Sequence, residues 1–232
     1  MYYFDIYYVI LILPAIFIAL FAQARVSSAF RKYSQVRNAQ GLTGAEVAQR
    51  VLRQNGINDV SFNRVAGNMT DYYDPKQNAI FLSENVYDSN SIAAVGVAAH
   101  EAGHAVQYAA GYFPIKVRTA IIPATRFGSM LSLPLIILGF LFNNSVGDTL
   151  LSVGVLLYGL AVFFQLVTLP IEYNASRRAL SAIETGGILN DDELPKARRV
   201  LNAAAMTYLA SLIVALAQLL RILMIIGGRR RK

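Results

Sequence analysis

The sequence contains no cysteine, and only two histidines occur among its 232 residues. The absence of cysteine excludes disulfides and thiolate metal sites, so any tightly bound metal would need imidazole and carboxylate ligands. Charged residues are also scarce: they make up 15% of the chain, against about a quarter in ordinary soluble domains, while 55% of the residues are hydrophobic. This balance predicts an integral membrane protein.

Acidic residues are fewer than basic ones, 14 against 21, which gives a net charge of +7. The basic residues cluster beside apolar segments and do not alternate with aromatic residues, as they would on a base-stacking surface. The charge therefore indicates membrane topology, and nucleic acid is not an expected partner.

Apolar runs divide the chain and predict three or four transmembrane helices. The runs are residues 6–22, 128–142 (with a start near Ile121), 149–170 and 203–226. Only Asp5 is charged before the first run, so we expect a retained anchor rather than a cleaved signal peptide. The second and third runs flank the short turn "NNSVGD" and predict a hairpin. The fourth contains Gln218 and Arg221, which allow it either to cross the bilayer or to lie partly in the interface.

Basic residues flank the first three runs on one side only, and the 143–148 turn carries none. The flanking residues are Arg25, Arg31, Lys32, Arg37, Arg118, Arg126, Arg177 and Arg178. By the positive-inside rule, residues 23–120 and 171–200 lie together in the cytoplasm.

The polar region after the first run predicts a small α+β domain. "TGAE" at 43–46 has capping-box spacing and opens a helix that runs through Gln54. Residues 59–65 and 78–83 predict short strands joined by a turn-rich segment. A helix from Ile92 to Ala110 follows, with N-cap candidates at 89–91 and a stop at Gly111.

These elements predict an α-rich α+β membrane protein with a short sheet. The expected segments are an anchor (1–24), a domain carrying the histidine helix (25–120), a transmembrane hairpin (121–170), a segment completing that domain (171–202), and an apolar helix with a basic tail (203–232).

The two histidines occur in "VAAHEAGHAVQYA" (97–109), with Glu101 directly after the first. Residues four apart share one helix face, so His100 and His104 can bind a single ion. His-Glu-x-x-His places two nitrogen ligands on zinc, and the glutamate reaches the reacting water as a general base. Two core histidines on a buried helix are the alternative. The spacing, the glutamate and the lack of other histidines favour one Zn²⁺ per chain.

A catalytic zinc usually has three protein ligands, and here the third must be a carboxylate. The downstream candidates are Asp148, Glu172, Glu184, Asp191, Asp192 and Glu193. Asp148 lies in the turn expected on the far side of the membrane, and 191–193 is expected to be a solvated helix start. Glu172 follows Pro170, on a helix expected to begin there, and the hairpin returns it to the side of the histidines. Alternatively, Glu172 is an interfacial carboxylate that forms an ion pair with Arg177 or Arg178.

The stretch "NAIFLSENVYDSNSIAAVGVAAHEAGHA", the apolar hairpin and the Glu in "IEYNAS" resemble the YugP-like family of neutral zinc metallopeptidases over nearly the whole chain. More distantly, the chain is similar to HtpX-like and prenyl-protease-related membrane peptidases. The resemblance implies a gluzincin-like domain with His100, His104 and Glu172 as zinc ligands and Glu101 as base. It also implies that an edge strand, about 78–83, pairs with extended substrate.

One position departs from the distant relatives, which commonly carry Asp four residues after the third ligand. Here that residue is Ser176. A carboxylate that would orient a histidine ligand is therefore missing, and Asn174 or Ser176 is the candidate substitute.

We hypothesise a membrane-embedded zinc-dependent endopeptidase that acts on proteins or peptides, membrane-associated ones included. The alternative is a non-catalytic membrane scaffold or accessory protein with a regulatory zinc site. A structural zinc site would be closed by four protein ligands, and a chain with two imidazoles and no thiolate supplies these poorly. A transporter ranks last, because 128–142 and 149–170 carry no charge.

Overall fold

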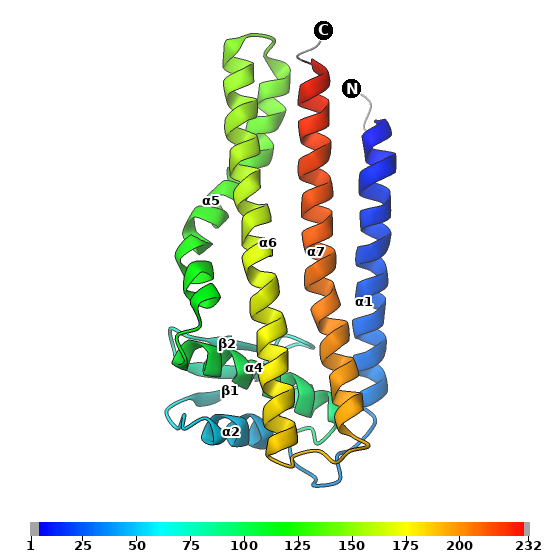
Figure 1. The fold of residues 1–232 in the computed structure, drawn as a ribbon, viewed down its shortest axis with the longest axis vertical. Coiled ribbons are helices and arrows are strands. Elements are labelled where there is room, and N and C mark those ends of the chain that lie inside the picture. Colours follow the sequence, from blue (N-terminus) through cyan, green and yellow to red (C-terminus); the bar gives the residue numbers. More distant parts are fainter. Residues whose placement is uncertain (1–4, 230–232) are drawn as a thin grey trace. The chain divides into compact units, whose positions relative to one another are not determined.

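The computed structural model describes residues 5–229 and confirms a helix-rich α+β fold with one small sheet (Figure 1). The chain forms two compact units. Of the described residues, the bundle unit comprises 5–21, 116–169 and 208–229, and the sheet unit comprises 22–115 and 170–207. Residues 230–232, most of the expected basic tail, lie outside the described residues.

Within the described part of the chain, four helical stretches are long and apolar enough to cross a membrane. They are η1 (Tyr8–Ile12) continuing into α1 (Leu13–Tyr33), α5 (Phe113–Leu141), α6 (Ser145–Thr185) and α7 (Leu194–Arg229). All four extend beyond the predicted apolar runs, because the helical backbone continues through polar sequence. The expectation that a new helix begins at Pro170 is wrong, since Pro170 lies inside α6. Ile171 directly after it is fully buried, so packing holds the helix where proline removes a backbone donor.

In the bundle unit, α5 and α6 form the predicted hairpin (Figure 1). Glycines allow the two helices to approach closely. A Cβ at Gly139 would lie 2.8 Å from the backbone nitrogen of Leu151, and one at Gly154 would lie 3.0 Å from the carbonyl oxygen of Ser132. Small residues of this kind are typical of helix contacts in membranes.

Arg221, the charge inside the last apolar run, is paired. Its guanidinium lies 2.7 Å from the carboxylate of Asp5 and 5.2 Å from the ring centroid of Tyr8. A charged side chain among apolar helices is expected to have such a partner.

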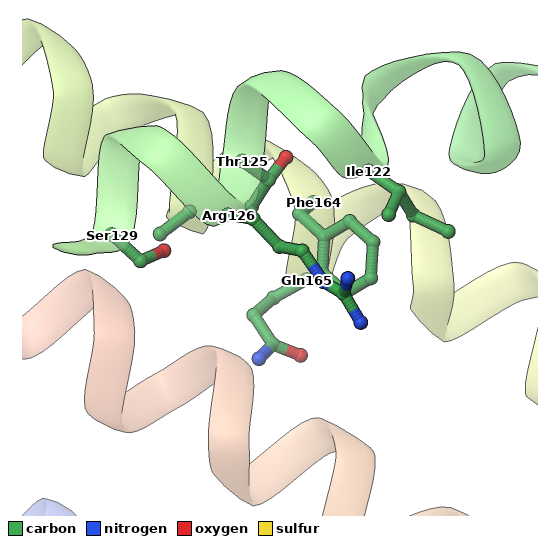
Figure 2. A pocket seen from close by; sticks show the side chains of 7 residues that line it. Ile122, Thr125, Arg126, Ser129, Phe164 and Gln165 are labelled. Carbon is green, nitrogen blue, oxygen red and sulfur yellow. The ribbon is translucent and has the colours of Figure 1, made fainter.

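The hairpin also has a cavity of about 530 Å³. Its lining residues are Ile122, Thr125, Arg126, Ser129, Ala161, Phe164 and Gln165. Figure 2 shows Arg126 and Gln165 entering it from the two different helices.

The sheet in the sheet unit has the order β1–β3–β2. β1 (Ser61–Val65) is parallel to β3 (Ala79–Ser83), and β2 (Tyr72–Asp74) is antiparallel to β3. Both predicted strands exist, but the segment read as a turn contains β2. Since β1 and β2 flank β3, the expectation that 78–83 is an edge strand is wrong. The Tyr72 ring stacks on Phe81 at 4.7 Å, a cross-strand contact that helps to hold the three-residue β2 on β3.

Helices α2 (Gly44–Gln54), α3 (Glu84–Tyr87) and α4 (Ile92–Ala109) complete this unit. The Thr43 capping box is confirmed, and Ser91 caps α4 through the amide of Ala94. Gly111 has φ +62°, which suits a residue just beyond a helix end. The core of the unit is apolar and includes the fully buried residues Val47, Ile80, Leu82, Ile92 and Ile183.

Candidate metal centre

His100 and His104 lie one turn apart on α4, and their rings meet edge to face with centroids 4.7 Å apart. Much of α4 is buried, from Ile92 to Gln107. The two imidazoles are themselves only partly exposed, at 14% and 12% of their side-chain surface. The helix therefore presents two adjacent nitrogen donors at a site shielded from bulk water.

α6 brings Glu172 to the same place. Its Oε2 lies 3.3 Å from Nε2 of His100 and 3.5 Å from Nε2 of His104, and the carboxylate is almost fully buried. The three donor atoms all lie within 4.8 Å of one another, and no other cluster of this kind occurs within residues 5–229. The buried carboxylate is compensated by the two imidazoles.

The close approach of α6 to α4 depends on Gly103. A Cβ at this position would lie 2.6 Å from the carbonyl oxygen of Ala175, one turn after Glu172. The small residue between the histidines thus makes room for the backbone that carries the carboxylate.

The other candidate carboxylates lie outside this cluster. Asp148 is in the first turn of α6, and Asp191 and Asp192 are exposed. The expectation of a solvated 191–193 cluster is wrong for Glu193, which is 6% exposed. Glu193 accepts hydrogen bonds from the backbone amides of Ala39 at 2.7 Å and Asn190 at 3.1 Å. These bonds join the loop at Ala39 to the start of α7, which is why the carboxylate is buried.

The donor set fits a zinc ion. Two imidazole nitrogens and one carboxylate oxygen are ligands that zinc accepts, and at metal–ligand lengths of 2.0 to 2.2 Å tetrahedral donors stand about 3.3 to 3.5 Å apart. The separations of Glu172 Oε2 from Nε2 of His100 and of His104, 3.3 and 3.5 Å, agree with this spacing. Three ligands leave one tetrahedral position for water or substrate.

The second nitrogen of each imidazole also has a partner. The Ser176 hydroxyl lies 3.1 Å from Nδ1 of His100, and the Gln107 side-chain oxygen lies 3.0 Å from Nδ1 of His104. Such contacts fix the tautomer and the ring orientation of a metal ligand. Ser176 therefore occupies the place expected for the missing carboxylate. The sequence reasoning missed Gln107, although its position one turn after His104 was a usable signal.

Gln107 is itself held by α6. Its amide donates to the carbonyl of Ile171 at 2.8 Å and to the side-chain oxygen of Asn174 at 3.0 Å. Asn174 in turn accepts a hydrogen bond from Arg178 at 2.8 Å. The partner of His100 thus comes from α6, and the partner of His104, Gln107 of α4, is itself held by α6, the helix that supplies Glu172.

Glu101 is buried, with 8% of its surface exposed. Burial raises the pKa of its carboxyl, and the neighbouring imidazoles oppose this only in part. Burial would lower the pKa of His104, but the hydrogen bond to Glu172 and the charge of Glu101 raise it overall. A carboxyl with a raised pKa can both accept and return a proton near neutral pH.

Comparison with known proteins shows the family of the chain. Residues 8–227 match the family model described as "Putative neutral zinc metallopeptidase". The chain is 43% identical over 223 residues to the "Putative membrane protease YugP" of Bacillus subtilis (strain 168), covering 96% of this chain and 98% of that protein. No solved structure matches the chain. With the match spanning nearly its full length, the chain belongs to the neutral zinc metallopeptidase family that the description names.

Proposed function

We propose that this protein is a membrane-embedded endopeptidase that uses one zinc ion per chain. The observation that supports this most directly is the convergence of His100, His104 and Glu172 from two helices. Their donor atoms lie within 4.8 Å of one another, and Oε2 of Glu172 stands 3.3 and 3.5 Å from the two imidazole nitrogens, the separation of two tetrahedral zinc ligands. In this proposal the three residues hold the ion. When bound, zinc supplies Lewis-acid polarisation of the peptide carbonyl and acidifies a water molecule.

Glu101 is the general base of the proposed reaction. Its buried carboxylate takes the proton of the attacking water and delivers it to the nitrogen of the departing amine, so the proton is conserved across the step. The raised pKa suits this double role, because the protonated form must persist long enough to act as an acid. Ser176 and Gln107 act as positioning residues, since each contacts a histidine and not the reacting atoms.

Proteins and peptides with an extended segment are the proposed substrates, including membrane-associated ones. An extended chain binds by adding to a free strand edge. β3 is unsuitable because both of its edges are paired. β2 is the edge strand that contacts the motif helix, since the ring of its Tyr73 packs against Tyr108 of α4 with centroids 5.5 Å apart. We therefore assign substrate pairing to β2.

The proposed location of the sheet unit is the cytoplasmic face of a bacterial cell membrane. Four helical stretches suit a membrane protein, and the relative from Bacillus subtilis is described as a membrane protease. The cytoplasmic side of the membrane is proposed because basic residues flank the first three apolar runs, and such residues favour the cytoplasm.

Elemental analysis of detergent-purified protein tests the proposal, together with peptidase assays on unfolded and membrane protein substrates. Wild type and Glu101→Gln should each carry about one zinc per chain, and only wild type should cleave. Glu172→Ala should lose the metal, whereas the control Glu184→Ala should keep it. If zinc-supplemented wild type holds no metal, the site is not a zinc site. If it holds zinc without any cleavage, the scaffold alternative replaces the enzyme.

A further inference from the structure

The sheet unit contains a cationic groove away from the metal ligands, between α1 and α7. Its volume is about 340 Å³. The lining residues are Arg25, Ser28, Ala29, Lys32, Tyr33, Arg199, Asn202, Ala203 and Met206. Those from α1 follow the i, i+3, i+4, i+7 spacing of one helix face, and so do those from α7. The groove therefore has two facing helical walls.

Three positive charges line the groove, and no carboxylate does. Arg199 donates a hydrogen bond to the Tyr33 hydroxyl at 3.2 Å, and the Lys32 ammonium lies 5.6 Å from the Tyr33 ring centroid. Within residues 5–229 neither Lys32 nor Arg199 forms an ion pair. Lys32 and Arg199 carry like charges that repel each other, so an anion bound between them would relieve that repulsion.

The groove lies at the polar boundary of two apolar runs. Arg25 lies three residues after the end of the uncharged run 6–22, and the run 203–226 begins at Ala203, which itself lines the groove. Ala29 and Met206 add apolar surface beside the cations. A ligand that suits these walls has both an anionic head and an apolar body.

We infer that this groove binds the phosphate head group of an anionic phospholipid. Basic pockets between membrane helices recognise such head groups through charge and hydrogen bonds. Here Arg25, Lys32 and Arg199 face the phosphate, and the Ser28 hydroxyl and the Asn202 amide offer further donors. The inference does not depend on peptidase activity.

Basic residues beside apolar runs can also serve only to orient the protein in the membrane. That role depends on the number of charges and not on their place around a helix. Arg31 gives the contrast, because it adjoins Lys32 on α1 but does not line the groove.

Lipid retention by purified protein in detergent distinguishes head-group binding from a role in membrane orientation, because no membrane has to be crossed in detergent. Native mass spectrometry would be used to titrate phosphatidylglycerol and phosphatidylcholine. We expect wild type to prefer phosphatidylglycerol, and Arg25→Gln/Lys32→Gln/Arg199→Gln to lose the preference, on the order of fivefold for each charge removed. The control Arg31→Gln/Arg53→Gln/Lys196→Gln removes equal charge outside the groove and should retain it.

Two further variants keep the test decisive if the triple variant misfolds. Lys32→Gln alone changes one exposed side chain and should weaken phosphatidylglycerol retention about fivefold. The charge-conserving Lys32→Arg/Arg199→Lys should keep it. Equal retention of both lipids by wild type, or an equal loss in the control, would overturn the inference. So would displacement of the lipid by inorganic phosphate or by a poly-glutamate peptide at matched concentration, since the groove would then serve a soluble anion.

Discussion

The hydroxyl of Ser176 on α6 lies 3.1 Å from Nδ1 of His100 on α4, so the ring nitrogen that faces away from Glu172 has a hydrogen-bonding partner. This contact links the helix that carries the carboxylate to the orientation of the first histidine. This partner is a neutral hydroxyl, so it adds no second negative charge close to Glu172.

Replacing this hydroxyl should weaken metal binding and leave the fold intact. For Ser176→Ala we expect about a tenfold loss of zinc affinity, the lower end of the effect seen when partners of metal-bound histidines are removed. Competition with a chromophoric chelator would measure it. Ser181→Ala, one and a half turns along α6 on an exposed position, is the control and should bind zinc as wild type does. Equal affinity in both variants would leave Ser176 without a positioning role.

Gln107 should matter in the same way for His104. Gln107→Met keeps the side-chain length and removes the hydrogen bonds to His104, Ile171 and Asn174. We expect zinc affinity to fall by about tenfold or more, while the metal-free protein loses only about 1 kcal/mol per hydrogen bond. Chelator competition gives the first value and thermal melting of the metal-free protein gives the second. A large loss of metal-free stability with unchanged zinc affinity would mean that Gln107 only holds the helices together.

The sequence predicts His100, Glu101 and His104 because their signal is local to one helix. The absence of cysteine and of other histidines indicates only that the third ligand is a carboxylate, and the place of Glu172 just after the hairpin favours it among six candidates. The structure brings Glu172 and the two histidines together, and their roles as ligands stay a prediction until metal is measured. The contact of Gln107 with His104 is local and could have been predicted, but its anchoring to α6 could not, because Ile171 and Asn174 lie more than 60 residues away in sequence.

Fold details were missed where tertiary contacts override local patterns. β2 is only three residues long and carries turn-forming neighbours, so nothing in the sequence separates it from a loop; pairing with β3 decides it. Pro170 predicts a helix boundary, yet α6 continues through it into the buried face around Ile171. The sequence predicts a solvated Glu193, because its hydrogen-bonding partner, the Ala39 amide, lies 154 residues away and cannot be inferred from local sequence.

The contact between α4 and α6 at Gly103 predicts a sharp steric effect. Gly103→Ala would place a methyl group 2.6 Å from the Ala175 carbonyl oxygen, and backbone atoms on both sides leave little room to move. We expect a loss of about 1 to 3 kcal/mol in the free energy of unfolding, together with weaker zinc binding as Glu172 is pushed away. Thermal melting in detergent and zinc content measure the two effects.

Gly96 on the same helix is the matched control, because a Cβ there has its nearest neighbour at an ordinary 3.8 Å. Gly96→Ala should be neutral or slightly stabilising, since alanine favours the helix over glycine by up to about 1 kcal/mol. If both substitutions behave alike, α6 does not depend on Gly103 for its approach.

Glu193 should be a structural carboxylate whose removal acts far from the metal ligands. Glu193→Ala deletes the acceptor for the amides of Ala39 and Asn190 and should cost about 2 kcal/mol of stability. Thermal melting in detergent measures this cost. Asp192→Ala next to it, an exposed side chain, should change the melting point little. Zinc content should stay the same in both, and its loss in Glu193→Ala would instead bring Glu193 back as a ligand candidate.

The pair between Asp5 and Arg221 predicts that the N-terminal and C-terminal helices of the bundle unit are coupled by charge. The pair is mostly buried, with 25% and 18% of the two side chains exposed, so breaking it leaves one charge poorly solvated. Asp5→Asn and Arg221→Gln should each lower the melting point in detergent, and the double variant should lose less than the sum of both. A coupling energy of about 1 kcal/mol or more is expected from such a cycle. Additive losses would mean that each residue is satisfied by other groups, and that Arg221 is held in the apolar run mainly by the Tyr8 ring 5.2 Å away.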